Sequence, residues 1–414
     1  MSRFLLSLTT ALIASAPAFA GKANVDLDAP AHRYHERELK DRFTLLKPDL
    51  EAGKLGLDES SEKAFLLSML AKLNVPVSSQ MLVFSTTSLQ LRFIRQDNPR
   101  ALFFTDDLYV GYIPGGRFEI VSIDPELGAV FYIFDMPRPG QPVRAERSER
   151  CMNCHADDDT GGVPGLVVKS VVPGVTGGSL DALRVGPPGH DAPFEKRFGG
   201  WYVTGDNGLA SAWGNAFGRW TGDAFVPVKI DPATRFDANR YPLPTSDVLP
   251  QLLHEHQAGF VNRVVRAGYA AREALHASGG RLTPAQSAEL DEQARIVTRY
   301  LLFADEAPLP AGGVAGDAAF KADFLRTRLA GPGGASLRDF DLKTRMFRHR
   351  CSYMIHSAPF HGLPPEMKQR IFRQLSAALN WTKPVAEYAY LPTTEKQAIV
   401  GILRKTLPGL PPGW

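Results

Sequence analysis

The spacing of apolar positions changes along the first third of the chain. Apolar side chains recur three and four positions apart over residues 60–73, which predicts a helix that Pro76 ends, and residues 32–46 predict an earlier helix. From residue 80 to 134, short β-branched and aromatic runs are separated by turn signals such as Asp97-Asn-Pro. This pattern predicts an antiparallel sheet of about five strands.

The rest of the chain has a different pattern. Residues 156–246 are rich in Gly, Pro and aromatic side chains and contain few periodic segments, which predicts loops with short strands. Helical spacing returns in segments 247–277, 283–303, 317–330, 337–356, 364–380 and 393–406. The predicted fold class is therefore α+β, with N-terminal helices and an antiparallel β-sheet, a loop-rich middle segment and a mainly α-helical C-terminal part.

The first twenty residues have the features of a secretory signal peptide in the usual order. Arg3 supplies a positive charge, a predominantly apolar run follows over residues 4–16, and Ala18-Phe-Ala20 has the small residues of a cleavage site. The run is shorter than the ~20 residues that span a bilayer. We therefore expect cleavage after Ala20, a periplasmic mature protein and no transmembrane segment in it.

Charge and cysteine content narrow the classes of function. The chain has 47 Lys and Arg against 44 Asp and Glu, a net charge of +3, which is too balanced for a protein that binds nucleic acid by neutralising phosphates. The glycine-rich stretches lack both G-x-G-x-x-G and the P-loop lysine, so no nucleotide site is predicted. Three cysteines are too few for a disulfide framework, so their positions matter more than their number.

Two of these cysteines form Cys151-Met-Asn-Cys154-His155, the C-x-x-C-H pattern of c-type haem attachment. Each thiol can form a thioether with one haem vinyl group, and the adjacent imidazole then becomes the proximal iron ligand. A thioredoxin-like redox pair needs a βαβ context, and a zinc site needs further ligands at paired spacing. A plain disulfide between the two thiols is the remaining alternative. The prediction is one covalent haem c bound through Cys151, Cys154 and His155.

The sixth iron ligand is left open by the sequence. An electron carrier needs His or Met at that position, whereas a haem enzyme leaves it free. His190, in a Gly- and Pro-rich loop, is the candidate second metal ligand beside His155, and an exposed loop histidine is the alternative. His349 and His356 are seven positions apart and would share one helix face, where packing of an arginine-rich helix is the simpler explanation. Cys351 is predicted to be buried and inert.

Several segments resemble a family of exported proteins that carry a single cytochrome c haem and have no established substrate. These segments are residues 85–90, 98–111, 148–155, 193–205 and 350–353. The resemblance implies haem binding and electron transfer, with Cys151 and Cys154 as the attachment thiols and His155 as the proximal ligand. Family members often carry histidine after the Trp-Tyr-Val-Thr-Gly segment, whereas residues 206–215 contain none, which directs attention to His190.

Together these observations predict a periplasmic c-type cytochrome that passes single electrons between redox partner proteins. The competing hypothesis is a haem-dependent oxidoreductase of peroxidase type, or a haem sensor, with an open sixth position. Chain length favours the competing hypothesis, because one haem needs far fewer residues for simple electron carriage; no catalytic residue is identified. The predicted organisation is a signal peptide (1–20), helices plus sheet (21–143), a haem-binding segment (144–246) and a helical region (247–414).

Overall fold

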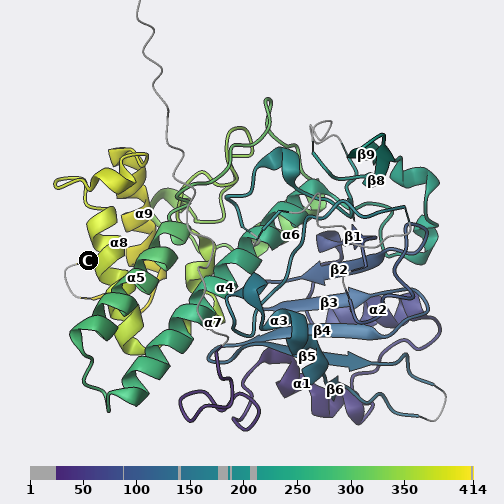
Figure 1. The fold of residues 1–414 in the computed structure, drawn as a ribbon, viewed down its shortest axis with the longest axis horizontal. Coiled ribbons are helices and arrows are strands. Elements are labelled where there is room, and N and C mark those ends of the chain that lie inside the picture. The colour runs from purple at the N-terminus through teal and green to yellow at the C-terminus, as the bar shows by residue number, and fades with distance from the viewer. Residues whose placement is uncertain are drawn as a thin grey trace, which may run out of the picture.

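The computed structural model describes residues 25–86, 88–138, 141–175, 185–186, 189–205, 212–411 and 414 (Figure 1). The predicted signal peptide and its cleavage site lie outside these residues. The architecture is α+β, as the sequence predicted, with an antiparallel sheet and a helical C-terminal part. None of the helices in the described ranges combines the length and apolarity that crossing a bilayer requires.

Two helices cover one face of the sheet. Helix α1 (Arg42–Glu51) begins ten residues later than predicted, because the Asp41 carboxylate accepts the backbone N–H groups of its first turn. Helix α2 (Glu62–Lys72) follows the predicted segment and starts after Ser61, whose side chain caps it. Both helices contribute to one hydrophobic core with the sheet, and Figure 1 shows them behind the strands.

The sheet has seven strands in the order β6-β5-β4-β3-β2-β1-β7, all pairs antiparallel. They are β1 (Met81–Val83), β2 (Arg100–Phe104), β3 (Leu108–Tyr112), β4 (Phe118–Asp124), β5 (Gly128–Phe134), β6 (Glu146–Arg147) and β7 (Trp201–Tyr202). The run 89–94, one of the short apolar runs between residues 80 and 134 that predict strands, forms turns instead. Strand β7 comes from the loop-rich middle segment and pairs with β1, so this segment extends the sheet.

The two faces of the sheet have different neighbours. Residues directly opposite one another in an antiparallel pair point to the same side. The register places Phe104, Tyr109, Val121 and Phe131 in one row on the face turned away from α1 and α2. We call this surface the site face of the sheet, and helices α3 (Met152–His155) and α4 (Val248–Ala277) lie over it (Figure 1).

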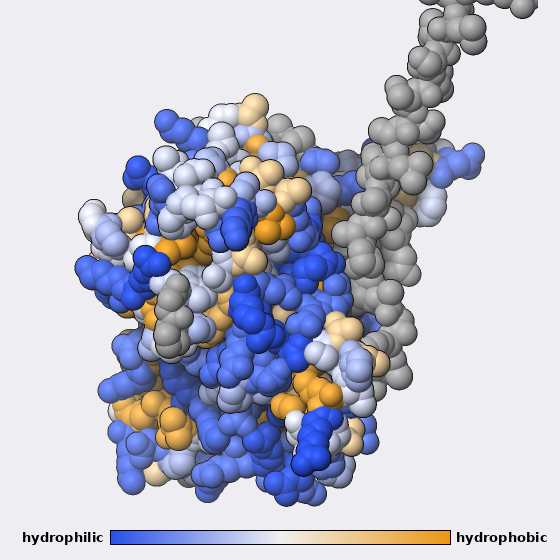
Figure 2. Space-filling model, turned by 90° about the vertical axis from the view of Figure 1, so that its left-hand side faces the viewer, coloured by the Kyte–Doolittle hydropathy of each residue, from blue (hydrophilic) through white to orange (hydrophobic). Residues whose placement is uncertain are grey.

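The helical part is organised around α4, a 30-residue helix that begins after the capping residue Asp247. The other helices are α5 (Pro284–Leu301), α6 (Ala318–Arg326), α7 (Ala358–His361), α8 (Pro365–Ala378) and α9 (Thr393–Thr406); β8 (Ala216–Thr221) and β9 (Ala224–Lys229) form a separate hairpin. One hydrophobic core runs from the site face through α4 to α9. The outer surface of this part is predominantly hydrophilic, with hydrophobic side chains in small separate areas (Figure 2).

The prediction of a helix over residues 337–356 is wrong. This segment forms turns that end in a short 3-10 helix, Tyr353–His356. Asp341 accepts the backbone N–H groups of the two residues after Leu342, and Leu342 itself adopts a positive φ of 60°. A left-handed residue and an Asx turn interrupt helical hydrogen bonding, so His349 and His356 share no helix face.

Candidate haem-attachment site

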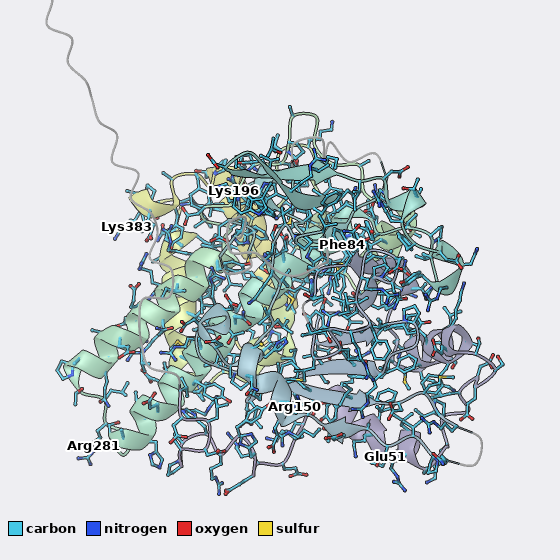
Figure 3. The ribbon with its side chains drawn as sticks, turned by 45° about the vertical axis from the view of Figure 1, so that its right-hand side comes forward. Glu51, Phe84, Arg150, Lys196, Arg281 and Lys383 are labelled. Carbon is cyan, nitrogen blue, oxygen red and sulfur yellow. The ribbon has the colours of Figure 1, made fainter. Side chains whose placement is uncertain are left out.

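The C-x-x-C-H motif lies in one helical turn on the site face. Ser148, immediately after β6, donates its N–H to the carbonyl of Phe131 on β5. This bond fixes the start of a 3-10 turn that leads directly into α3. Figure 3 shows Arg150, the residue before the motif, between the long helices and the strands. The sheet edge therefore sets where the motif begins.

The two motif cysteines are free thiols in different surroundings. Cys151 is partly buried against the core, where burial raises its thiol pKa, while a hydrogen bond with Ser148 opposes this effect. Cys154 is exposed. One helical turn thus presents one thiol toward the core and one toward solvent. Both remain available for covalent attachment.

His155 is oriented by a backbone carbonyl. Its Nδ1 lies 2.9 Å from the carbonyl oxygen of Gly165, and its ring packs on Phe131 with 4.5 Å between centroids. Because a carbonyl only accepts, the proton belongs on Nδ1 and Nε2 carries the free lone pair. Burial, opposed by the bond to Gly165, lowers the pKa of His155 to about 4, so the ring is neutral near pH 7. A neutral, oriented imidazole is the form that ligates iron.

The carbonyl that orients His155 is itself held by α4. Asn262 accepts the N–H of Leu166 at 2.7 Å through Oδ1 and donates to the Leu166 carbonyl at 2.9 Å through Nδ2. Gly165 is needed here because a Cβ would approach the Asn262 oxygen to 2.4 Å. We call this arrangement the Asn262 clamp. It connects the longest helix to the proximal histidine.

A charged pair lies on the site face beside the motif. Arg100 on β2 donates to Glu119 on β4 at 2.9 Å, and Glu119 also accepts from Ser88 and Gln90. Burial works against ionisation of Glu119, but the Arg100 charge and these hydrogen bonds outweigh it and lower the pKa of the carboxyl. The Nε of Arg100 is buried with no hydrogen-bond partner in the described ranges. This N–H is an enclosed, unsatisfied donor on the site face.

An open pocket of about 760 Å³ lies next to the motif. Its lining combines guanidinium groups, apolar side chains and two carboxylates that pair with Arg117, and it includes Leu89, Leu91, Arg92, Phe93, Arg117, Asp135, Glu146, Ser148 and Arg150. Leu89 and Leu91 are 48% and 55% exposed, which is high for leucine. Apolar contacts together with cationic groups are the chemistry that suits a porphyrin with two propionates. The pocket therefore offers both kinds of contact beside the motif, although Cys151, Cys154 and His155 are not among its lining residues.

His190 is placed elsewhere in the structure. Its side chain is fully buried, so the alternative of an exposed loop histidine is wrong. Its Nδ1 lies 2.8 Å from Nδ1 of His256, and its ring stacks on Tyr300 and Phe303 with centroid distances of 4.1 and 4.6 Å. In the described ranges these contacts come from α4, α5 and the residues after α5, and none comes from the motif. Ligation of iron by His190 stays a prediction.

The remaining candidates contribute no second thiol or histidine to the motif's surroundings. Cys351 is fully buried, as predicted, and burial raises its pKa to about 12. His356 lies near Thr406 of α9, with 3.4 Å between its Nε2 and the hydroxyl oxygen. Both residues belong to the packing of the C-terminal helices.

The sequence interpretation missed a histidine that faces the motif's side of the sheet. His254 on α4 packs against Phe104, Tyr109 and Trp201, with centroid distances of 5.6, 5.5 and 6.2 Å. Its side chain is only 6% exposed, and burial lowers its pKa to about 3. Polar residues on a buried helix were the available signal, since Gln251, His254, Glu255, His256, Gln257 and Asn262 interrupt the apolar positions of α4.

Comparison with known proteins adds no relative. No family model, no curated protein and no solved structure matches the chain.

Proposed function

We propose that the protein is an exported c-type cytochrome that transfers single electrons through one covalently bound haem c. The observation that carries this proposal is the C-x-x-C-H turn, in which the Gly165 carbonyl holds His155 with Nε2 free for iron. Haem supplies a one-electron iron couple when bound. Cys151 and Cys154 attach it, and His155 is the proximal ligand.

The surrounding residues have separate roles in this proposal. Apolar side chains of the site face exclude water from one side of the haem, which tunes its potential. Arginine side chains near the motif offer charge-assisted hydrogen bonds to the propionates. The exposed position of Cys154 supports a haem edge that redox partner proteins can approach. The N-terminal sequence supports export to the periplasm, where cytochrome c maturation takes place.

Cysteine variants test the attachment directly. The full-length chain would be expressed in a bacterium that matures c-type cytochromes, and the pyridine haemochrome spectrum of the purified protein would be recorded. We expect a c-type spectrum for the wild type, a shifted single-thioether spectrum for Cys151→Ala or Cys154→Ala, and no covalent haem for the double variant. Cys351→Ala is the matched control and should keep the wild-type spectrum. A wild-type protein without covalent haem would refute the proposal.

Export is tested separately. The mature protein should be recovered from the periplasmic fraction with Gly21 as its first residue. A chain retained in the cytoplasm with Met1 intact would contradict this part of the proposal.

A further inference from the structure

We propose that His254 is the second axial ligand of the haem iron, opposite His155. This inference rests on the proposed haem function and specifies the coordination that the sequence left open. With His155 and His254 both bound, the haem iron would have six ligands, as an electron carrier requires.

The first observation is that the His254 ring lies in the interior with nitrogens that are not fully enclosed. Its side chain is 6% exposed, and no hydrogen bond joins its ring to another residue in the part of the chain that the structure describes. Nε2 of His190, by contrast, is fully enclosed and unpaired within the described ranges. An imidazole nitrogen that is unpaired and not enclosed is open to a ligand, and a bond to iron would use it.

The second observation is that both histidines stand over the same face of the sheet. Phe131, which contacts His155, is directly opposite Val121, and Val121 is directly opposite Tyr109, which contacts His254. Two strand spacings of about 4.8 Å place the two contact points roughly 10 Å apart. The two histidines therefore contact residues of the same face that lie two strands apart.

Arg100 lies on the same face of the sheet. It is four positions before Phe104 on β2, which contacts His254, and it donates to Glu119, two positions before Val121 on β4. Because alternate residues of a strand share a face, this guanidinium belongs to the group of side chains on the site face.

Helix α4 fixes both ligands in this arrangement. His254 is part of the helix, and the Asn262 clamp, eight positions later, holds the carbonyl that orients His155. Eight residues correspond to about 12 Å along the axis and a little over two turns. A single rigid element thus sets the positions of the two iron-binding groups relative to each other.

The geometry of α4 distinguishes His254 from His190. Successive helical residues are about 100° apart, so His254 and His256 point to nearly opposite sides of α4. His254 faces the sheet. His256 contacts His190, and its Nε2 forms a hydrogen bond of 2.7 Å with the Ser352 hydroxyl. His190 therefore approaches α4 from the side away from the motif.

The test is spectroscopic and uses the full-length protein with covalent haem. The wild type should give a low-spin ferric electron paramagnetic resonance signal, and its ferrous form should not bind CO. His254→Ala should keep covalent haem, become high-spin and bind CO rapidly, and added imidazole should restore the low-spin spectrum. His190→Ala is the matched control and should behave as the wild type.

A second variant covers the case in which removal of the ring prevents folding. His254→Met provides another axial ligand of suitable length, and it should remain low-spin with a higher midpoint potential. A His254→Ala protein that stays low-spin and excludes CO would overturn the assignment while leaving the proposed function intact. A high-spin wild type that binds CO would overturn the assignment and favour an oxidoreductase or sensor with an open sixth position over an electron carrier. A wild type that carries no covalent haem would overturn both.

Discussion

Replacement of Asn262 by leucine should weaken the fold and alter the haem together. Leucine has a similar volume, so the change removes the two hydrogen bonds to Leu166, at 2.7 and 2.9 Å, without opening a large cavity. The N–H and carbonyl of Leu166 then lose their partners in a buried setting. At roughly 1–3 kcal/mol for each of the two unsatisfied groups, we expect the free energy of unfolding to fall by about 2–6 kcal/mol.

The same change should reach the iron through His155. Without the Asn262 clamp, the Gly165 carbonyl is no longer fixed at 2.9 Å from Nδ1 of His155, and a weaker hydrogen bond makes the imidazole a poorer electron donor. The ferric form is then less stabilised, so the midpoint potential of the haem should rise. Urea unfolding of the holoprotein measures the first effect, and redox titration measures the second.

Gln251→Leu is a matched control on the same helix. Gln251 is buried and donates to the Tyr202 carbonyl at 2.9 Å and to the Ser246 hydroxyl at 3.2 Å, away from the motif. The Gln251→Leu substitution should lower the free energy of unfolding by a similar amount and leave the midpoint potential of the haem unchanged. The reasoning is refuted if Asn262→Leu alters neither quantity, or if Gln251→Leu shifts the potential equally.

Further predictions concern other buried groups. Arg197→Met should destabilise the fold by about 3–5 kcal/mol in urea unfolding, because it leaves Glu255 buried without its partner at 2.9 Å; adding Glu255→Gln should recover part of the loss. Burial raises the pKa of Glu306 to about 7, so the folded state binds its proton more tightly than the unfolded state does. Stability should therefore fall as pH rises from about 4.5 to about 7, and Glu306→Gln should flatten this slope. Cys351 should resist iodoacetamide until the chain unfolds, because its thiol is buried and its pKa is about 12; rapid labelling of the native protein would contradict this.

Local patterns predicted much of the fold. The sheet strands between residues 80 and 134 alternate with strong turn signals, and α2 has both a cap and regular apolar spacing, so propensity and tertiary packing agree there. The predicted secondary structure was wrong where tertiary contacts override the spacing of apolar residues. The apolar run 89–94 has strand-like composition yet forms turns, and residues 337–356 have helical spacing yet are interrupted at Leu342.

Only the residues of the site that are contiguous in the sequence could be predicted. The C-x-x-C-H motif is contiguous, so spacing alone identified Cys151, Cys154 and His155. The roles of His254 and Asn262 depend on which sides of α4 face the sheet and the Gly165 segment. Packing between segments about 100 to 150 residues apart sets this orientation. His190 shows the same limitation, since its Gly- and Pro-rich loop gave no sign of full burial against His256.

Peptide mapping of the purified holoprotein shows directly whether haem is bonded to Cys151 and Cys154. After proteolysis, mass spectrometry would follow the peptide that contains Cys151, Cys154 and His155. We predict that this peptide carries one haem joined through both cysteine sulfurs. Recovery of the same peptide with two free thiols, or with a disulfide between them and no haem, would contradict the account.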